Sequence, residues 1–142
     1  MSDAEFKALK ASNPGMTQKC LDENRFGGVL AWRPDDPACF DMLPDQRWTG
    51  LWEKGWEWTN FCPDPAADCD WMAKRGIWLT FAKDAYRGPK LADGIYRIEF
   101  IGRRTRQAGN FGHTNAYDHL MVVDRLISIR QVEPPRTERP GP

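Results

Sequence analysis

The sequence predicts a mainly β protein, a small antiparallel β-barrel or sandwich of about five or six strands with a short, partly helical N-terminal arm. Alternation of apolar and polar residues with period two begins near Trp48 and continues to about Val132. Turn signals separate the alternating segments, and no long helical pattern lies between them. Closing such a sheet into a barrel also removes its exposed edges, which favours a barrel.

Length and composition fit a single domain in solution. The chain has 142 residues, enough for one core. No run approaches ~18 apolar residues, so the sequence predicts no membrane-spanning helix. The N-terminus is acidic and polar rather than basic and then apolar, which predicts no secretory signal and a cytoplasmic location. A chain that had already lost such a signal would look the same.

The net charge of zero hides an asymmetry along the chain. Residues 35–70 hold nine acidic and two basic side chains, whereas residues 71–142 hold thirteen basic and seven acidic ones. Either the two regions neutralise each other across the fold, or one face is a basic patch for an anionic partner. Strong non-specific binding of duplex DNA is not expected, because the chain as a whole is not a polycation.

The four cysteines have wide and irregular spacings. Cys20, Cys39, Cys62 and Cys69 are predicted to be free thiols in a reducing compartment. Cys62 and Cys69 flank a turn-like segment and would suit a disulfide if the protein were exported. Their separation does not match the close cysteine pairs of structural zinc sites, so no metal site is predicted.

The N-terminal arm, residues 1–45, is predicted to contain two short helices. Ser2 and Glu5 form a capping box that starts the first helix, and the segment from Asn13 to Gly15 ends it. Thr17–Phe26 is predicted as the second helix, and Val29–Trp32 as a short strand. Neither helix is long enough to be stable alone in water, so each must dock on the core.

The β domain, residues 46–132, begins with an aromatic hairpin. Trp48–Trp52 and Trp56–Cys62 flank a turn, and Ile77–Ala82 is the next strand. After a long turn, Tyr96–Thr105 is the most regular strand, with Tyr96, Ile98 and Phe100 on one face. The last strand, Leu120–Val132, is predicted to carry a β-bulge at Asp124–Arg125. Residues 133–142 form a proline-rich tail that is predicted to be disordered.

The leading functional hypothesis is a binding module for an anionic ligand at a basic strand–loop mouth. Arginines bind phosphate and carboxylate in paired geometry, and aromatic rings stack on a base or sugar. The ligand would be a nucleotide, a single-stranded nucleic acid or an acidic protein segment. The residues expected to bind it lie at the end of one strand and in the loop that follows: Arg103, Arg104, Arg106, His113, Tyr117 and His119. The competing interpretation is a solvated strand end with a flexible loop.

Two alternatives use other chemistry. His113 and His119, oriented by Asp118, would serve as general acid and base in a phosphodiesterase-like hydrolase. The Trp48–Trp58 hairpin would instead bind a protein partner, because six tryptophans between residues 48 and 78 are too many to bury in one small barrel. The sequence has no P-loop, no dinucleotide-binding glycine motif and no nucleophile elbow, so no cofactor is predicted. It does not predict the oligomeric state.

Overall fold

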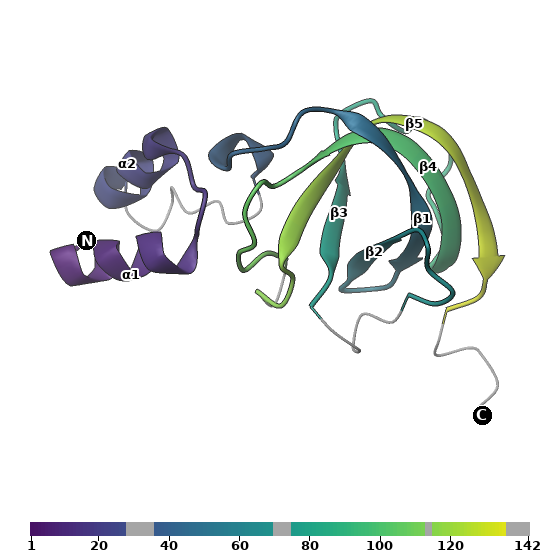
Figure 1. The fold of residues 1–142 in the computed structure, drawn as a ribbon, viewed down its shortest axis with the longest axis horizontal. Helices are drawn as coiled ribbons and strands as arrows, with labels where there is room; N and C mark the ends of the chain where they lie inside the picture. The colour runs from purple at the N-terminus through teal and green to yellow at the C-terminus, as the bar shows by residue number, and fades with distance from the viewer. Residues whose placement is uncertain (28–35, 70–74, 113–114, 136–142) are drawn as a thin grey trace.

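The computed structural model describes residues 1–27, 36–69, 75–112 and 115–135. Five strands close into a barrel, and the helices lie beside it (Figure 1). This confirms the predicted mainly β fold with a helical N-terminal region. No helix in the described ranges is long and apolar enough to cross a membrane. The elements are α1 Asp3–Ser12, α2 Gln18–Gly27, the 3-10 turn η2 Pro37–Cys39, β1 Gln46–Lys54, β2 Thr59–Pro63, β3 Ile77–Phe81, β4 Gly94–Arg104 and β5 His119–Glu133.

The strand order around the barrel is β1-β2-β3-β5-β4. Strands β4, β1, β2 and β3 lie side by side in that order, which is the spatial order of a Greek key. Strand β5 closes the barrel between β3 and β4. The prediction of an antiparallel sheet holds for four pairings, but β3 and β5 pair in parallel, from Ile77↔His119 to Phe81↔Val123. A closed ring with an odd number of strands cannot alternate direction throughout, so one parallel pair is unavoidable.

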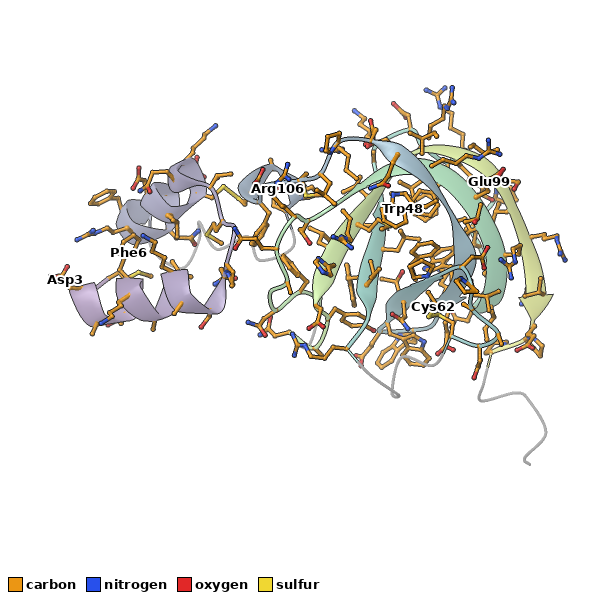
Figure 2. All side chains as sticks on the ribbon, in the orientation of Figure 1. Asp3, Phe6, Trp48, Cys62, Glu99 and Arg106 are labelled. Atoms are coloured by element: carbon orange, nitrogen blue, oxygen red, sulfur yellow. A yellow bond between two sulfur atoms is a disulfide. The ribbon has the colours of Figure 1, made fainter. Side chains whose placement is uncertain are left out.

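The barrel core follows the alternation of the sequence. Tyr96, Ile98 and Phe100 on β4 are buried, as their shared face predicts. Trp48 and Trp52 on β1 also point inward, and the Trp48 indole donates a hydrogen bond to the Gly102 carbonyl at 3.2 Å (Figure 2). The first half of the predicted aromatic hairpin therefore serves mainly as core.

The predicted bulge in the last strand is present. Ile101 on β4 pairs with Arg125 and Gly102 pairs with Val123, so Asp124 is an extra residue in the ladder. Similar register shifts occur twice more along β5. The bulge bends β5 and places the Asp124 carboxylate beside β4, where it meets an arginine described below.

The arm folds as two helices that pack on one side of the barrel. The Ser2 hydroxyl accepts a hydrogen bond from the Glu5 amide at 3.1 Å, which confirms the predicted N-cap of α1. Helix α2 covers the range predicted for the second helix. Phe40, just after η2, packs edge-on against Phe111 of the β4–β5 loop, with ring centroids 4.8 Å apart. The predicted strand Val29–Trp32 and tail residues 136–142 lie outside the described residues, and β5 extends through Glu133.

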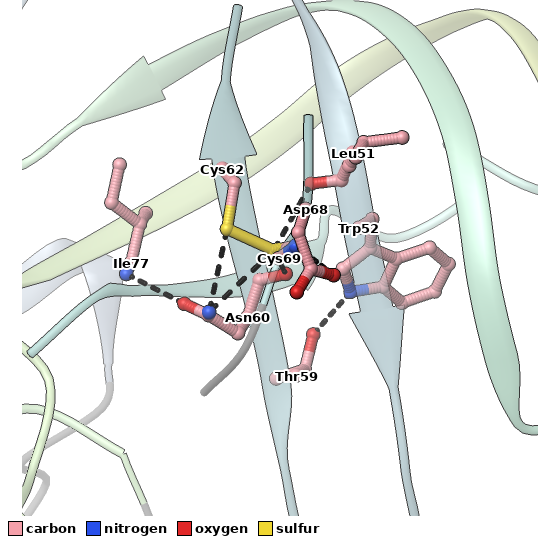
Figure 3. The surroundings of a disulfide bond; sticks show 8 residues. All are labelled: Leu51, Trp52, Thr59, Asn60, Cys62, Asp68, Cys69 and Ile77. Carbon is pink, nitrogen blue, oxygen red and sulfur yellow. Dashed lines mark hydrogen bonds between the residues drawn. A yellow bond between two sulfur atoms is a disulfide. The ribbon is translucent and has the colours of Figure 1, made fainter. Parts of the chain in front are cut away.

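The prediction of free cysteines is wrong. Cys20 of α2 is joined to Cys39 of η2, and Cys62 of β2 is joined to Cys69. The first bond links two parts of the arm that are 19 residues apart, a proximity that sequence spacing does not reveal. The second closes the loop after β2, where Asn60 lies against both sulfur atoms (Figure 3). Disulfides of this kind are typical of proteins that fold in an oxidising compartment.

Candidate binding groove

The three arginines of the predicted basic mouth all contact acceptors within the chain. The Arg103 guanidinium donates two hydrogen bonds to the Asp124 carboxylate, at 2.7 and 2.9 Å. Arg104 Nε donates to the backbone carbonyl of Thr105 at 3.2 Å. Arg106 lies at the junction of arm and barrel (Figure 2) and donates to Asp41 at 3.1 Å. An external anion would therefore compete with carboxylates for Arg103 and Arg106.

The pKa shifts around Arg103 show that nearby carboxyl groups balance its positive charge. The hydrogen bond from Arg103 holds the pKa of Asp124 below its usual value, and the same bond raises the pKa of the guanidinium. The pKa of Asp45 is raised, mainly because this carboxyl shares a hydrogen bond with Asp124. The Arg103 guanidinium thus interacts with two carboxyl groups: Asp45, which lies just before β1, and Asp124, which lies in the bulge of β5.

His119 and Asp118 lie at the start of β5 and are also engaged. His119 Nδ1 lies 3.1 Å from the Thr105 carbonyl oxygen and 2.9 Å from its hydroxyl. Burial, assisted by the charge of Arg104, lowers the pKa of His119. Asp118 forms an ion pair with Arg75. Both residues and Arg75 border a cavity of about 500 Å³, but the second predicted catalyst, His113, lies outside the described residues.

Tyr117, predicted to stack on a ligand, is a core residue. It is 4% exposed, and its ring meets Trp78 edge-on with centroids 5.1 Å apart. Among the described residues, its buried hydroxyl makes no hydrogen bond of normal geometry, although the Thr59 backbone lies near enough to oppose part of the pKa shift. Burial, with a smaller contribution from the charge of Glu53, raises the pKa of Tyr117 to about 12. Gly112, at φ 85°, lets the chain pass close to both rings, where a side chain would collide with them.

A larger hollow, which we call the aromatic groove, lies at the β1–β2 turn. Its volume is about 700 Å³, within the range of ligand sites. Strand β3 and the β3–β4 connection complete it. Six of its lining side chains are aromatic: Trp52, Trp56, Trp58, Trp78, Phe81 and Tyr86.

The tight turn between β1 and β2 forms the rim of the groove. The Gly55 amide donates to the Trp58 carbonyl at 3.0 Å, which closes the turn and leaves Trp56 at its tip. The Trp58 ring packs directly over Gly55, where a Cβ would lie 1.9 Å from a ring atom. The lack of a side chain at Gly55 therefore makes room for Trp58, while Trp56 is 82% exposed.

The other side of the groove comes from the β3–β4 connection. Tyr86 lies 6.4 Å from Phe81, and Phe81 lies 5.4 Å from Trp52, between ring centroids. The Tyr86 hydroxyl donates to the Pro89 carbonyl, which fixes the ring within its own loop. The Trp52 indole donates to the Thr59 hydroxyl (Figure 3). These bonds hold the rings in place before any ligand arrives.

Charge in the aromatic groove is sparse and mixed. Lys54 forms an ion pair with Asp93 at 3.0 Å, which also ties the β3–β4 connection to β1. The other charged lining residues, Glu57 and Lys90, have opposite signs and are exposed. The groove is therefore an apolar surface with a few polar groups, unlike the basic mouth that the sequence predicted.

The sequence revealed part of this groove. The prediction that the tryptophans cannot all be buried is met by Trp56, while Trp71 lies outside the described residues. Tyr86 and Lys90 were missed, because they occupy a turn with no periodic pattern. The signal that pointed to the site was the excess of indole rings around residues 48–58.

The class that the structure defines for this chain is a small closed barrel of five strands, four of them in Greek-key order. No protein family, no curated protein and no solved structure matches the sequence or the fold. The function must therefore be argued from the residues of the site itself.

Proposed function

We propose that this chain is a ligand-binding module that holds an extended ligand in the aromatic groove. The observation that carries the proposal is Trp56, an indole 82% exposed at the rim of a 700 Å³ hollow lined by five more aromatic rings. Grouped apolar rings that face solvent mark interaction sites, because leaving them exposed is unfavourable in the free protein.

The position of the groove supports the same function. In barrels of OB type, ligands lie across the face of the second and third strands, beside the loop that joins the first two. Here Trp78 and Thr80 of β3 and the turn carrying Trp56 occupy that place. Fold alone does not define function, so the argument depends on the rings themselves.

Anion binding at the basic mouth remains a separate prediction with less support. The acceptors around Arg103 and Arg106 already neutralise much of the charge that would attract an anion. For a phosphodiesterase, Nδ1 of His119 contacts Thr105, so Nε2 would be the nitrogen that exchanges protons, and the second imidazole of that prediction, His113, lies outside the described residues. A protein-interaction site is limited on this hairpin, because Trp48 and Trp52 point into the barrel.

The two disulfides are the evidence for the cellular compartment in which the protein works. Cys20–Cys39 and Cys62–Cys69 would be reduced in an ordinary cytosol, so we infer that the protein works in an oxidising compartment rather than in the cytoplasm. Alkylation of the denatured protein without reductant, followed by mass spectrometry, tests this by counting the thiols that react. Four reactive thiols would contradict the inference.

Calorimetric titration with three soluble polymers tests the binding function: cellohexaose, a ten-residue oligothymidylate and a proline decapeptide. At least one is expected to bind. Trp56→Ala should weaken that binding about tenfold or more, because it removes the exposed ring. Phe26→Ala is the matched control, since Phe26 is 81% exposed but lies on α2. Binding that survives Trp56→Ala, or binding of none of the three at millimolar concentration, would overturn the proposal.

A further inference from the structure

We propose that the ligand of the aromatic groove is an uncharged, β-1,4-linked oligosaccharide of pyranose rings with equatorial hydroxyls, such as a cellulose-type glucose chain. This inference rests on the proposed function and names the ligand class of the same site. Three independent features lead to it: the charge of the lining, the kind of surface that the rings present, and the disulfides.

The charge of the groove argues against a polyanion. A nucleic acid strand carries a phosphate at every nucleotide, and proteins that bind it supply a track of lysines and arginines. Among the lining residues, Lys54 is paired with Asp93, and Glu57 offsets Lys90. The three arginines of the predicted basic mouth, Arg103, Arg104 and Arg106, are not part of the lining. A neutral ligand needs no such track of positive charge.

The surface of the groove matches the two kinds of surface on a sugar ring. When the hydroxyls are equatorial, the ring faces present only C–H groups, which carry slight positive charge. The face of an aromatic ring is slightly negative, so it attracts these C–H groups while both surfaces leave water. The hydroxyls then point outward in the plane of the sugar, where Glu57, Thr80 and Lys90 supply donors and acceptors.

The groove presents partly exposed rings from separate elements, so a ligand can contact several of them along its length. Trp58 lies in the β1–β2 turn, Trp78 and Phe81 lie on β3, and Tyr86 lies in the β3–β4 connection. Trp56 extends this surface into solvent. A hollow of about 700 Å³ with rings on separate elements suits a chain of several sugars better than one monosaccharide.

The disulfides point to a setting in which such a ligand is abundant. Two disulfides, Cys20–Cys39 and Cys62–Cys69, are expected in a protein that works outside the reducing cytosol. Structural polysaccharides are made and kept outside that compartment, whereas single-stranded nucleic acids are not plentiful there. This observation is independent of the groove and favours the same ligand class.

Titration calorimetry with matched hexasaccharides tests the inference. In cellohexaose and chitohexaose, equatorial β-1,4 bonds join the rings into a straight chain. In maltohexaose, the axial α-1,4 bond curves the chain. We expect the two β-linked sugars to bind at least about fivefold more tightly than maltohexaose, with affinity unchanged between low and high salt. Trp56→Ala should weaken binding about tenfold or more, and Trp56→Phe should retain most of it.

The outcomes separate this inference from the function beneath it. Binding of only the oligothymidylate or the proline peptide, lost in Trp56→Ala, would overturn the sugar ligand and leave the groove as a binding site. Equal binding of maltohexaose would overturn the preference for a straight β-1,4-linked chain and with it the inference. Insensitivity of every probe to Trp56→Ala would overturn both, provided that Phe26→Ala behaves as wild type.

Discussion

The basic strand–loop region and the aromatic groove differ in how their side chains are satisfied. Arg103 and Arg106 meet carboxylates from distant parts of the chain, Asp124 and Asp41, so their charge is used within the fold. In the groove, Trp56 is exposed and contributes nothing comparable to the core. The comparison shows that a cluster of charges in sequence is weak evidence for a site, because its partners can come from anywhere.

An excess of aromatic residues is better evidence for a binding site, because the core can bury only a limited number of rings. A small barrel has a fixed interior, and rings beyond its capacity must lie at the surface. The number of ion pairs that a protein surface can form is not limited in this way. The predictions below test whether the strand–loop region is structural and the groove functional, beginning with the largest expected effect.

Tyr117 was expected to bind ligand, and the structure makes it part of the packing behind Trp78. Its pKa is about 12 in the folded protein, against about 10 for an ordinary phenol, because burial disfavours the phenolate. The folded state keeps a proton that the unfolded chain loses in this interval. The contribution of Tyr117 to stability is therefore fully present below pH 10 and falls by up to about 3 kcal/mol as the pH rises towards 12.

Urea unfolding at pH 9 and at pH 11.5 measures this loss for wild type and for Tyr117→Phe. The variant keeps the ring against Trp78 and lacks the proton, so its loss of stability should be smaller by that amount. Near neutral pH its stability should be within about 1 kcal/mol of wild type, since the missing hydroxyl makes no hydrogen bond of normal geometry among the described residues. Tyr86→Phe removes a different phenol and serves as the control. An equal alkaline loss in wild type and Tyr117→Phe would contradict the assignment.

Arg103→Ala and Trp56→Ala should have opposite consequences. Loss of Arg103 removes the two hydrogen bonds that Asp124 accepts from it. The free energy of unfolding should fall by about 1–2 kcal/mol, a range that already allows for the partial exposure of the pair to water. Trp56→Ala should change it by less than about 0.5 kcal/mol, because the ring is exposed. Denaturation and calorimetry on both variants give a two-by-two test. Ligand binding that is lost in Arg103→Ala while the fold remains intact would restore the basic mouth as the site.

Local patterns made much of the fold predictable. The hairpin, the face of β4 and the bulge at Asp124 follow from alternation and its interruption, which are properties of a few consecutive residues. The parallel pairing of β3 with β5 and the bond between Cys20 and Cys39 depend on the closed ring and on the docked arm. No local pattern encodes either, and both were missed.

The candidate site was less predictable for the same reason. Its indoles were visible as an excess, but their gathering with Tyr86 and Lys90 depends on where the β3–β4 connection crosses the barrel end. The basic mouth was predicted only from residues that lie close together in the sequence. Its arginines are ordered by Asp41, Asp45 and Asp124, whose positions only the closed barrel brings together.

The smallest expected effect concerns His119 and the acid side of the pH range. Burial lowers the pKa of His119 in the folded protein, so the unfolded chain takes up its proton first as the pH falls. Stability from this group is present above pH 6.5 and declines below it. His119→Asn, whose amide can also donate to Thr105, should show a shallower decline between pH 7 and 5 in thermal unfolding. An equal or steeper decline in His119→Asn would contradict a lowered pKa at His119.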